Sequence, residues 1–514
     1  MNLHSRKRDA GRAEKRAHAA AKRQRPLSSA DAPDLHRAAL RIAPMRSALW
    51  NAYGGALLNR RRFPAAMLAG SNALAIDPAC ADALGNIAAL LRDMEYPSQA
   101  ELALRRALRA APEHPGLHNA LVHVLQGSGR GEEARAACRR ALALAPAFAD
   151  AWCNAGLGEQ QAGRRGNASS LFIRAVRIDA EHALARFNGA LLALEEGRIA
   201  AGWRDYRHRF AAGQARPRRR FAIPEWNGEA LKGGKLLIWR EQGVGDEILF
   251  SSCYADAIKA VGAGADQPSS AVVVECDPRL AGLFARSFPQ ATVRAARRVD
   301  AGGDHELVER TDCAQHISAG SLPALLRARL GDFPQRVRWL FADDNLIAVW
   351  RREVEALGRQ LRVGFAWSSG LATLNRRGAY APLALWGPVL TTPGVSFVNL
   401  QRGAVTEELA AAERAFGIRV VAAPRLDLKD DFENLAALIS CLDLVIAPAV
   451  SVAELSAALG TPTWRFGARD WTQLGSAARP WSPSMRCFQP STGEGLQSAL
   501  VGIGRALKTV VGKN

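Results

Sequence analysis

Residues 236–246 read Leu236-Leu-Ile-Trp-Arg-Glu-Gln-Gly-Val-Gly-Asp246, a short apolar run that leads into a glycine-rich turn. The apolar run is typical of a buried strand, and the pattern from Glu247 to Ala260 predicts a helix. Glycines at such a turn let the backbone approach an anion, which the N–H groups at the start of the helix then face. The stretch therefore predicts a parallel α/β unit, with Gly243 and Gly245 in the turn and Asp246 at the start of the helix.

The same alternation of strands and helices continues to the end of the chain. Strands are predicted over 271–276, 291–295, 361–367, 395–400, 419–422 and 442–446, and a closing helix over 496–511. We expect two doubly wound domains with parallel sheets, at 235–345 and 346–514. Such a pair of domains places a cleft at the carboxyl ends of the strands.

The first half of the chain is a repeat array with a period of 34 residues. The columns that share this period are Pro44, Pro78, Pro112 and Pro146; Ala39, Ala73, Ala107, Ala141 and Ala175; and Ala66, Ala100, Ala134 and Ala168. Small residues let paired helices approach, and large residues such as Trp50, Leu84 and Trp152 fill the opposite side. This pattern resembles the tetratricopeptide repeat and predicts about five helical pairs over 34–212, the last of them at 188–210. The array would serve either as a docking surface for a partner or acceptor, or as a spacer or oligomerisation surface.

Two basic stretches flank this array. Residues 1–33 lack apolar periodicity and are expected to form a solvated arm, and 213–234 would be a linker that contains Arg216-Pro-Arg-Arg-Arg220. The formal net charge of +19 favours anionic partners, and about a third of this charge comes from the arm. The arm lacks the interleaved aromatic residues of a nucleic-acid platform, so a nucleic-acid partner is not expected.

Composition indicates a globular cytoplasmic protein. No apolar run reaches the ~18 residues that span a bilayer, and the N-terminus has no apolar signal segment. The eight cysteines are scattered without any Cys-x-x-Cys pair, which is typical of reduced core residues and gives no zinc site.

Several motifs of the second half carry a family resemblance. They are Trp226-Asn-Gly-Glu229, Gly234-Lys235, Glu241-Gln-Gly-Val-Gly-Asp246, Leu442-Asp-Leu-Val-Ile446 and Ala457-Ala-Leu-Gly-Thr-Pro-Thr-Trp464. With the repeats they resemble the bacterial tetratricopeptide-repeat glycosyltransferase-like proteins, whose C-terminal half is related to the heptosyltransferases. The whole architecture is similar to that of the O-linked N-acetylglucosamine transferases. This resemblance covers about residues 34–511 and implies a GT-B fold, with two Rossmann-like domains that bind the acceptor and a nucleotide-diphosphate sugar donor and that need neither metal nor cofactor.

The resemblance also implies which residues form the site. A transferase without a metal must neutralise the leaving diphosphate with backbone N–H groups and basic side chains. The donor-binding candidates are Ser368, Ser369, Gly370, Arg376, Arg377, Gln401, Ser451 and Glu454. Of these, Gln401 is expected to face the nucleotide base, and Arg376 or Arg377 either contacts phosphate or belongs to a solvated loop. Asp246 matches the position to which the heptosyltransferase-like proteins assign a general base, and the alternative role for it is a helix cap.

One departure from the family pattern leaves the enzymatic function open. Heptosyltransferase-like proteins carry Val-Asp-Thr and then a His, whereas this chain reads Pro448-Ala-Val450 and then Glu454. Glu454 would either bind a sugar or ribose hydroxyl or be a solvated or capping carboxylate. His316, Trp367 and Trp464 are expected to be structural.

Three functions remain open from the sequence. The first is inverting glycosyl transfer from a nucleotide-diphosphate sugar to a protein or glycan acceptor that the repeats present. The second is a non-catalytic adaptor with a degenerate transferase-like half, and the third is a polyanion-binding protein.

Overall fold

The computed structural model describes residues 32–262, 271–296, 306–308, 312–369, 379–423, 426–491 and 494–512. The expected basic arm therefore lies almost wholly outside the described residues. The chain divides into two compact units, Met1–Ala185 and Arg186–Asn514. Among the described helices, none combines the length and the apolarity needed to cross a bilayer.

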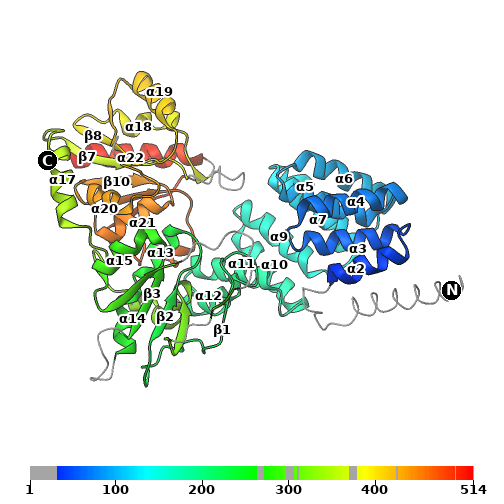
Figure 1. Cartoon of the computed structure of the whole chain (residues 1–514). Helices are drawn as coiled ribbons and strands as arrows, with labels where there is room; N and C mark the ends of the chain where they lie inside the picture. The colour runs from blue at the N-terminus through cyan, green and yellow to red at the C-terminus, as the bar shows by residue number, and fades with distance from the viewer. Residues whose placement is uncertain are drawn as a thin grey trace, which may run out of the picture. The chain divides into compact units, whose positions relative to one another are not determined.

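The first unit is an array of helical pairs, each packed on the next (Figure 1). α2 (Ala32–Ile42) is followed by α3 (Ser47–Leu58) with α4 (Phe63–Ile76), α5 (Ala81–Asp93) with α6 (Pro97–Ala110), α7 (Pro115–Gly127) with α8 (Gly131–Leu144), and α9 (Ala149–Gln161) with α10 (Arg165–Ile178). This is the arrangement of tetratricopeptide repeats, so the predicted helical array is confirmed.

The repeating residues lie where the helices meet. Ala73, Ala107, Ala141 and Ala175 are all 0% exposed, because only a methyl group fits between the helices there. At the start of a repeat, the indole N–H of Trp152 donates a 2.8 Å hydrogen bond to the carbonyl of Pro146. In the repeats that begin with Trp50 and Trp152, the proline turn and the tryptophan are therefore joined by a hydrogen bond.

Two neighbouring columns compensate each other in size. A Cβ atom on Gly156 of α9 would lie 2.6 Å from the Phe172 ring of α10, so the glycine makes room for that ring. One repeat earlier the corresponding positions hold Val122 and Cys138, both buried. The interior stays packed although the larger side chain moves from one helix to the other.

The end of the helical array belongs to the second unit. α11 (Ala183–Glu195) crosses the division, and α12 (Ile199–Tyr206) lies within the second unit. The ring of Trp203 lies 5.9 Å from that of Trp471 and 6.1 Å from that of Trp481, measured between centroids. The units divide at residue 185, and α12, which belongs to the second unit, packs its aromatic face against the α/β half.

A parallel four-stranded sheet opens the α/β half, with the order β4-β3-β2-β6. Its strands are β2 (Leu236–Trp239), β3 (Val272–Cys276), β4 (Ala291–Ala295) and β6 (Gln315–Ser318), and its helices are α13 (Val244–Ser251), α14 (Tyr254–Val261), α15 (Ala281–Ser287) and α16 (Leu322–Leu326). β1 (Arg219–Phe221) and β5 (Glu306–Val308) form a separate parallel pair. Every residue of β2 and β3 is buried, as a strand covered on both faces requires.

A parallel six-stranded sheet follows, with the order β12-β11-β10-β7-β8-β9. Its elements are α17 (Asp344–Glu355), β7 (Leu361–Phe365), α18 (Gly387–Leu390), β8 (Val395–Asn399), α19 (Thr406–Phe416), β9 (Val420–Val421), α20 (Phe432–Ser440), β10 (Leu444–Ala447), α21 (Ser451–Leu459), β11 (Thr463–Phe466), β12 (Met485–Phe488) and α22 (Gly495–Val511). The predicted closing helix and the predicted parallel α/β architecture are therefore confirmed.

In both sheets the order of strands reverses beside the first strand, so that later strands are added on its other side. Numbered from its own first strand, the second sheet has the order 3-2-1-4-5-6, and the first sheet has the order 3-2-1-4. The reversals lie between β7 and β10 and between β2 and β6. In open parallel sheets, ligands bind outside the carboxyl ends of the strands at this reversal. The loops that follow β2, β6, β7 and β10 are therefore the places where the fold predicts a ligand site.

Several side chains tie the two sheets together. The guanidinium of Arg279, after β3, donates to the carbonyl of Lys429 at 3.0 Å, and the guanidinium of Arg286 on α15 donates to Glu433 on α20 at 2.9 Å. These contacts hold the carboxyl ends of the two sheets in a defined relation.

Candidate functional site

The turn between β2 and α13 carries the glycines that the sequence singled out. Gly243 is exposed, and its N–H donates to Asp246 Oδ2 at 3.2 Å, so Asp246 caps the first turn of α13. Gln242 adopts the left-handed conformation with φ of 60°, which is uncommon for a residue with a side chain. Its N–H donates to the carbonyl of Arg216 at 2.8 Å, and its Nε2 donates to the hydroxyl of Tyr206 at 3.1 Å. The turn is therefore held rigid from both sides.

A buried ion pair anchors the same turn from beneath. The guanidinium of Arg209 forms two hydrogen bonds, of 2.8 and 2.6 Å, with the carboxylate of Glu241. The two side chains are 1% and 0% exposed. Arg209 also donates to the hydroxyls of Ser318, the last residue of β6, and Ser321, in the turn after it. Neither charge can reach a ligand, so this pair positions the loops after β2 and β6.

Glu247 connects α13 with the ends of β2, the strand before it, and β3, the strand after it. Its Oε1 accepts from Arg240 at 2.7 Å, and its Oε2 accepts from the N–H of Asp277 at 2.8 Å. Burial raises the pKa of Glu247 to about 7, although the guanidinium of Arg240 opposes this rise. Because the side chain is 1% exposed, Glu247 is a positioning residue and not a candidate acid or base toward substrate.

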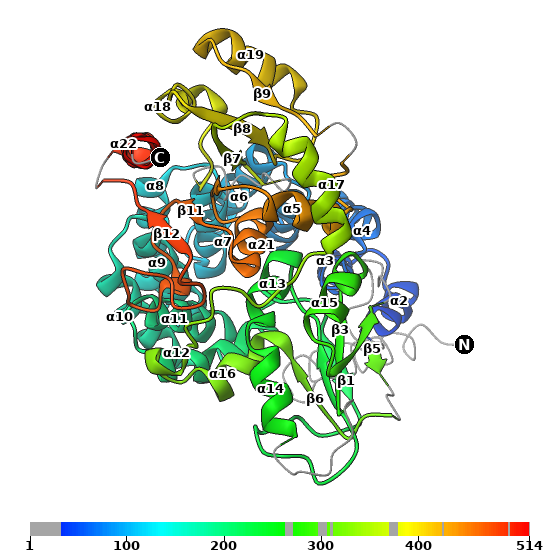
Figure 2. The same ribbon diagram turned by 90° about the vertical axis from the view of Figure 1, so that its left-hand side faces the viewer.

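The first turns of α13 and α21 meet. A Cβ atom on Gly245 would lie 3.4 Å from the Cα atom of Ser451 and 3.6 Å from its backbone nitrogen. Figure 2 shows α13 and α21 side by side between the two sheets, as they also are in Figure 1. Two helix N-termini therefore lie at one place, and each contributes partial positive charge; Gly245 and Asp246 on α13 and Ser451 on α21 are partly exposed there. This arrangement suits an anionic group.

Glu454 lies in the first turn of α21 but serves the protein interior. Both of its oxygens accept from the guanidinium of Arg479, at 2.7 and 2.8 Å. Arg479 also donates to the hydroxyl of Thr472 at 3.1 Å, and Asp470 accepts from that hydroxyl. Because Glu454 is only 9% exposed and doubly bonded, its carboxylate fits a buried structural role, which neither of the two alternatives from the sequence, a sugar or ribose contact and a solvated or capping carboxylate, describes.

The loop after β7 is held by Gln401. The Gln401 Oε1 accepts from the N–H groups of Trp367 and Ser368, at 2.9 and 2.8 Å, and its Nε2 donates to the carbonyl of Arg402 at 3.2 Å. Gln401 is 3% exposed, so it shapes the Ser368–Ser369 loop and does not present its amide to a base as expected. The N–H of Ser368 is engaged in this way, which leaves its hydroxyl for a ligand.

Three of the donor-binding candidates cannot be placed. Gly370, Arg376 and Arg377 lie outside the described residues. The remaining candidates come from loops that the fold gathers at the carboxyl ends of the strands: Gly243, Gly245 and Asp246 after β2, Ser368 and Ser369 after β7, Gln401 after β8, and Ser451 and Glu454 after β10.

Arg402 is a candidate that sequence reasoning missed. The parallel register of β7 and β8 pairs Phe365 with Asn399, and its continuation places Ser368 opposite Arg402. The side chain of Arg402 is half-exposed and forms no ion pair with any other described residue. The signal was present in the sequence, because Arg402 follows a predicted strand by two residues, as Ser369 follows another.

Three aromatic residues behave as expected for structural groups. His316 Nδ1 accepts from the indole N–H of Trp239 at 3.2 Å, and the His316 ring stacks on Phe221 at 4.0 Å. Burial lowers the pKa of His316 to about 4, which keeps the ring neutral at physiological pH. Trp367 and Trp464 are 2% and 8% exposed and lie in the core of the second sheet.

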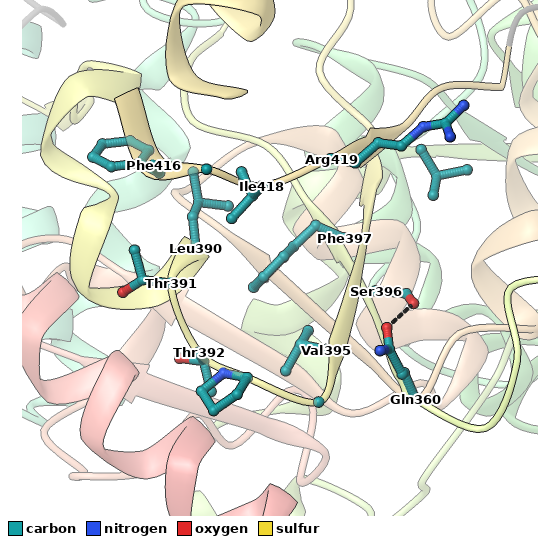
Figure 3. Close-up of a pocket in the computed structure, with 14 residues that line it drawn as sticks. Gln360, Leu390, Thr391, Thr392, Val395, Ser396, Phe397, Phe416, Ile418 and Arg419 are labelled. Carbon is teal, nitrogen blue, oxygen red and sulfur yellow. Dashed lines mark hydrogen bonds between the residues drawn. The ribbon is translucent and has the colours of Figure 1, made fainter. Parts of the chain in front are cut away.

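A different cavity lies at the opposite edge of the second sheet. This cavity has a volume of about 420 Å³. Figure 3 shows Leu390, Val395, Phe397 and Ile418, which line it near the amino ends of β8 and β9. Its wall includes the 2.8 Å hydrogen bond between the hydroxyl of Ser396 and Gln360. Because ligands of this sheet type bind at the carboxyl ends, we do not assign the donor site to this cavity. No cluster of three or more metal-ligating side chains occurs among the residues that the structure describes.

The sequence is similar to a named bacterial protein. It is 35% identical over 416 residues to protein FlbA of Caulobacter vibrioides, an alignment that covers 78% of this chain and 68% of FlbA. No family model matches the chain.

Solved structures of tetratricopeptide proteins match the helical part at low identity. They include YrrB, described as having an unusual peptide-binding site (21% identical, covering 32% of this chain and 84% of YrrB, TM-score 0.26). TTC0263 of Thermus thermophilus is 18% identical, over 35% of this chain and 97% of its own, with a TM-score of 0.32. PilF of Pseudomonas aeruginosa is 18% identical, over 42% of this chain and 87% of its own, with a TM-score of 0.31.

Proposed function

The chain belongs to the family of the Caulobacter vibrioides protein FlbA, and we propose that it is a metal-independent glycosyltransferase of the GT-B type. Its two α/β domains would be Rossmann-like and would bind a nucleotide-diphosphate sugar and an acceptor between them. The helical array would dock the protein or glycan that carries the acceptor hydroxyl.

The observation that carries this proposal is the meeting of two helix N-termini at the carboxyl ends of two doubly wound sheets. The strand order 3-2-1-4-5-6 of the second sheet is the order found in dinucleotide-binding folds. Gly245 and Ser451 are in direct contact, so no other side chain separates the starts of α13 and α21 there. A diphosphate placed there would face backbone N–H groups from both domains.

The described residues supply further groups for the leaving diphosphate. The hydroxyls of Ser368 and Ser451 can donate to phosphate oxygens, and Arg402 can supply the charge that a metal ion would otherwise provide. Gln401 supports this function indirectly, because it joins the Ser368 loop to the loop after β8, which carries Arg402.

Asp246 is the proposed general base. The acceptor hydroxyl would lose its proton to the carboxylate of Asp246 while its oxygen forms a bond to the anomeric carbon of the sugar. The bond between that carbon and the diphosphate oxygen breaks at the same time, and the nucleoside diphosphate leaves with the electron pair. Attack from the face opposite the leaving group inverts the anomeric centre.

The Asp246→Asn variant tests this proposal most cleanly. Asparagine keeps a side-chain oxygen that can accept from the N–H of Gly243, so the variant keeps the fold but removes the base. Release of nucleoside diphosphate from a panel of nucleotide sugars should fall by about 10²–10⁴-fold, with an unchanged melting temperature. The matched Asp246→Ala variant should lose both activity and about 1 kcal/mol of stability. An Asn variant with full turnover, or a wild-type protein that processes none of the nucleotide sugars, would contradict the proposal.

One observation favours a second function, that of a non-catalytic adaptor. Glu454 occupies the position on α21 where the heptosyltransferase-like proteins carry histidine. Both oxygens of the Glu454 carboxylate accept hydrogen bonds from Arg479. In an adaptor the helical array would bind a partner protein while the α/β half only supports it. An Asp246→Asn strain with wild-type phenotype, together with a partner captured by the repeat unit, would favour this function over catalysis.

A further inference from the structure

The helical array contains a groove that its own packing pattern explains. In the column that holds Leu104 and Phe172, the third repeat has the smaller Cys138, and Val122 only partly compensates for it. A space of about 450 Å³ opens beside Cys138 and is lined by residues of α8, α9 and α10. We call this space the α8–α10 groove; its lining residues are Arg135, Cys138, Arg139, Leu142, Ala155, Glu159, Asn167, Ser170 and Leu171.

The floor of the α8–α10 groove is apolar and its rim is polar. Cys138 is buried, and burial raises the pKa of its thiol to about 11, so the sulfur stays uncharged. Leu142, Ala155 and Leu171 complete the floor. A floor of this kind and size accepts one branched apolar side chain.

The charged groups on the rim are not balanced. The carboxylate of Glu159 is held by Arg164 through two hydrogen bonds, of 2.6 and 2.7 Å, and Arg135 is paired with Glu132. Arg139 is exposed and forms no ion pair with any other residue in the described part of the chain. The rim therefore presents one uncompensated positive charge beside the apolar floor.

Arginines outnumber acidic residues on the two outer helices of this groove, α8 and α10. The second helices of the pairs, α6, α8 and α10, hold nine arginines and three acidic residues, whereas the first helices, α5, α7 and α9, hold one arginine and four acidic residues. Positive charge is thus concentrated on one set of helices, which attracts an acidic ligand along several repeats. The N-terminal arm of the chain cannot be that ligand, because nine of its first 25 residues are basic and only two are acidic.

We propose that the α8–α10 groove binds an acidic segment of a partner protein, with one leucine-like side chain inserted beside Cys138 and acidic side chains placed along Arg139 and the neighbouring arginines. The apolar floor supplies affinity and the arginines supply orientation and attraction. This surface is separate from the α/β site and does not require that site to be catalytic.

The test uses the full chain and a fluorescein-labelled peptide with one leucine between aspartate triplets, followed by fluorescence anisotropy. Replacing the leucine by serine should weaken binding by about tenfold or more, since an apolar side chain is no longer buried. Replacing the aspartates by asparagines should weaken it by a similar factor, and raising sodium chloride from about 50 to about 500 mM should weaken the aspartate peptide alone. Equal affinity for the aspartate and asparagine peptides would overturn the proposal.

Two variants locate the binding surface. Arg139→Glu should weaken peptide binding by about fivefold or more, whereas the control Arg60→Glu, the same charge change in the turn after α3, should stay within about twofold. Cys138→Leu fills the groove with the residue found one repeat earlier and should abolish binding. If Cys138→Leu lowers the melting temperature, its loss of binding could come from a disturbed fold, and the test then rests on the peptide affinity of Arg139→Glu. Unchanged binding by Arg139→Glu, or displacement of the peptide by a tighter-binding single-stranded oligonucleotide, would overturn the assignment to an acidic peptide.

Discussion

Replacing Glu454 by glutamine separates the two roles that its position allows. In the structure Glu454 is the counter-ion of Arg479, and the two side chains are 11% and 1% exposed. Removing one member of such a pair leaves the other charge buried, which costs about 3–5 kcal/mol of unfolding free energy. We expect the lower end, about 3 kcal/mol, since the carboxylate of Asp470 lies in the same network and offsets part of the charge of Arg479.

Urea unfolding followed by tryptophan fluorescence measures this change. Ten of the twelve tryptophans lie after residue 185, so the signal reports mainly on the α/β half. The double variant Glu454→Leu with Arg479→Met removes both charges and should return to within about 1 kcal/mol of the wild type. Glu407→Gln, an exposed carboxylate on α19, is the matched control and should leave the midpoint unchanged.

A specific pair of results would refute the structural role of Glu454. If Glu454→Gln leaves the midpoint unchanged yet abolishes binding of nucleoside diphosphates, Glu454 is a ligand-binding residue and its bond to Arg479 contributes little. If the variant loses stability and the double variant regains both stability and nucleotide binding, Glu454 is the buried counter-ion of Arg479 and does not bind the ligand.

Three further predictions concern stability. Burial raises the pKa of Glu247 to about 7 from 4.5, so between these pH values the folded state keeps a proton that the unfolded state releases. The unfolding free energy should therefore fall by about 3 kcal/mol from pH 4.5 to 7. Glu247→Gln should make the unfolding free energy from urea titrations nearly independent of pH in this range. In the first unit the hydrogen bond with Asp150 raises the pKa of His182, so the stabilisation is present below about pH 6.5 and is lost as pH rises through the raised value; Asp150→Asn should remove this dependence of the melting temperature. Within α22, Gly504→Ala should destabilise the protein by about 1–3 kcal/mol, because its Cβ would lie 2.2 Å from the carbonyl oxygen of Pro388. Gly502→Ala should stabilise it by about 0.5–1 kcal/mol, because its Cβ would lie 3.8 Å from Phe488. Equal effects of the two variants in thermal unfolding would contradict this packing.

The parts of the fold that repeat or alternate could be predicted from the sequence. A period of 34 residues needs only local spacing to predict helical pairs, and short apolar runs followed by helical patterns predict parallel strands. The turn with Gly243 and Asp246 could also be predicted, because the strand, the glycines and the capping residue are contiguous.

The partners of buried polar side chains could not be predicted. Glu454 pairs with Arg479, which lies 25 residues away, and Gln401 bonds to backbone N–H groups 33 and 34 residues away. Nothing local marks these contacts, because tertiary packing decides them. The division between the two units at residue 185 could not be predicted for the same reason. In the sequence Trp203 looks like another repeat residue, and only the structure shows its aromatic neighbours in the α/β half.

The most direct test of nucleotide binding at the two helix N-termini is hydrogen–deuterium exchange of the full chain with and without a nucleoside diphosphate. We predict slower exchange at the carboxyl ends of the strands, in residues 240–246, 366–369 and 448–453, and loss of this protection in the Arg402→Ala variant. Protection at 390–397 and 416–419 instead, around the cavity at the amino ends of β8 and β9, would contradict the proposed site, as would no protection with any nucleoside diphosphate.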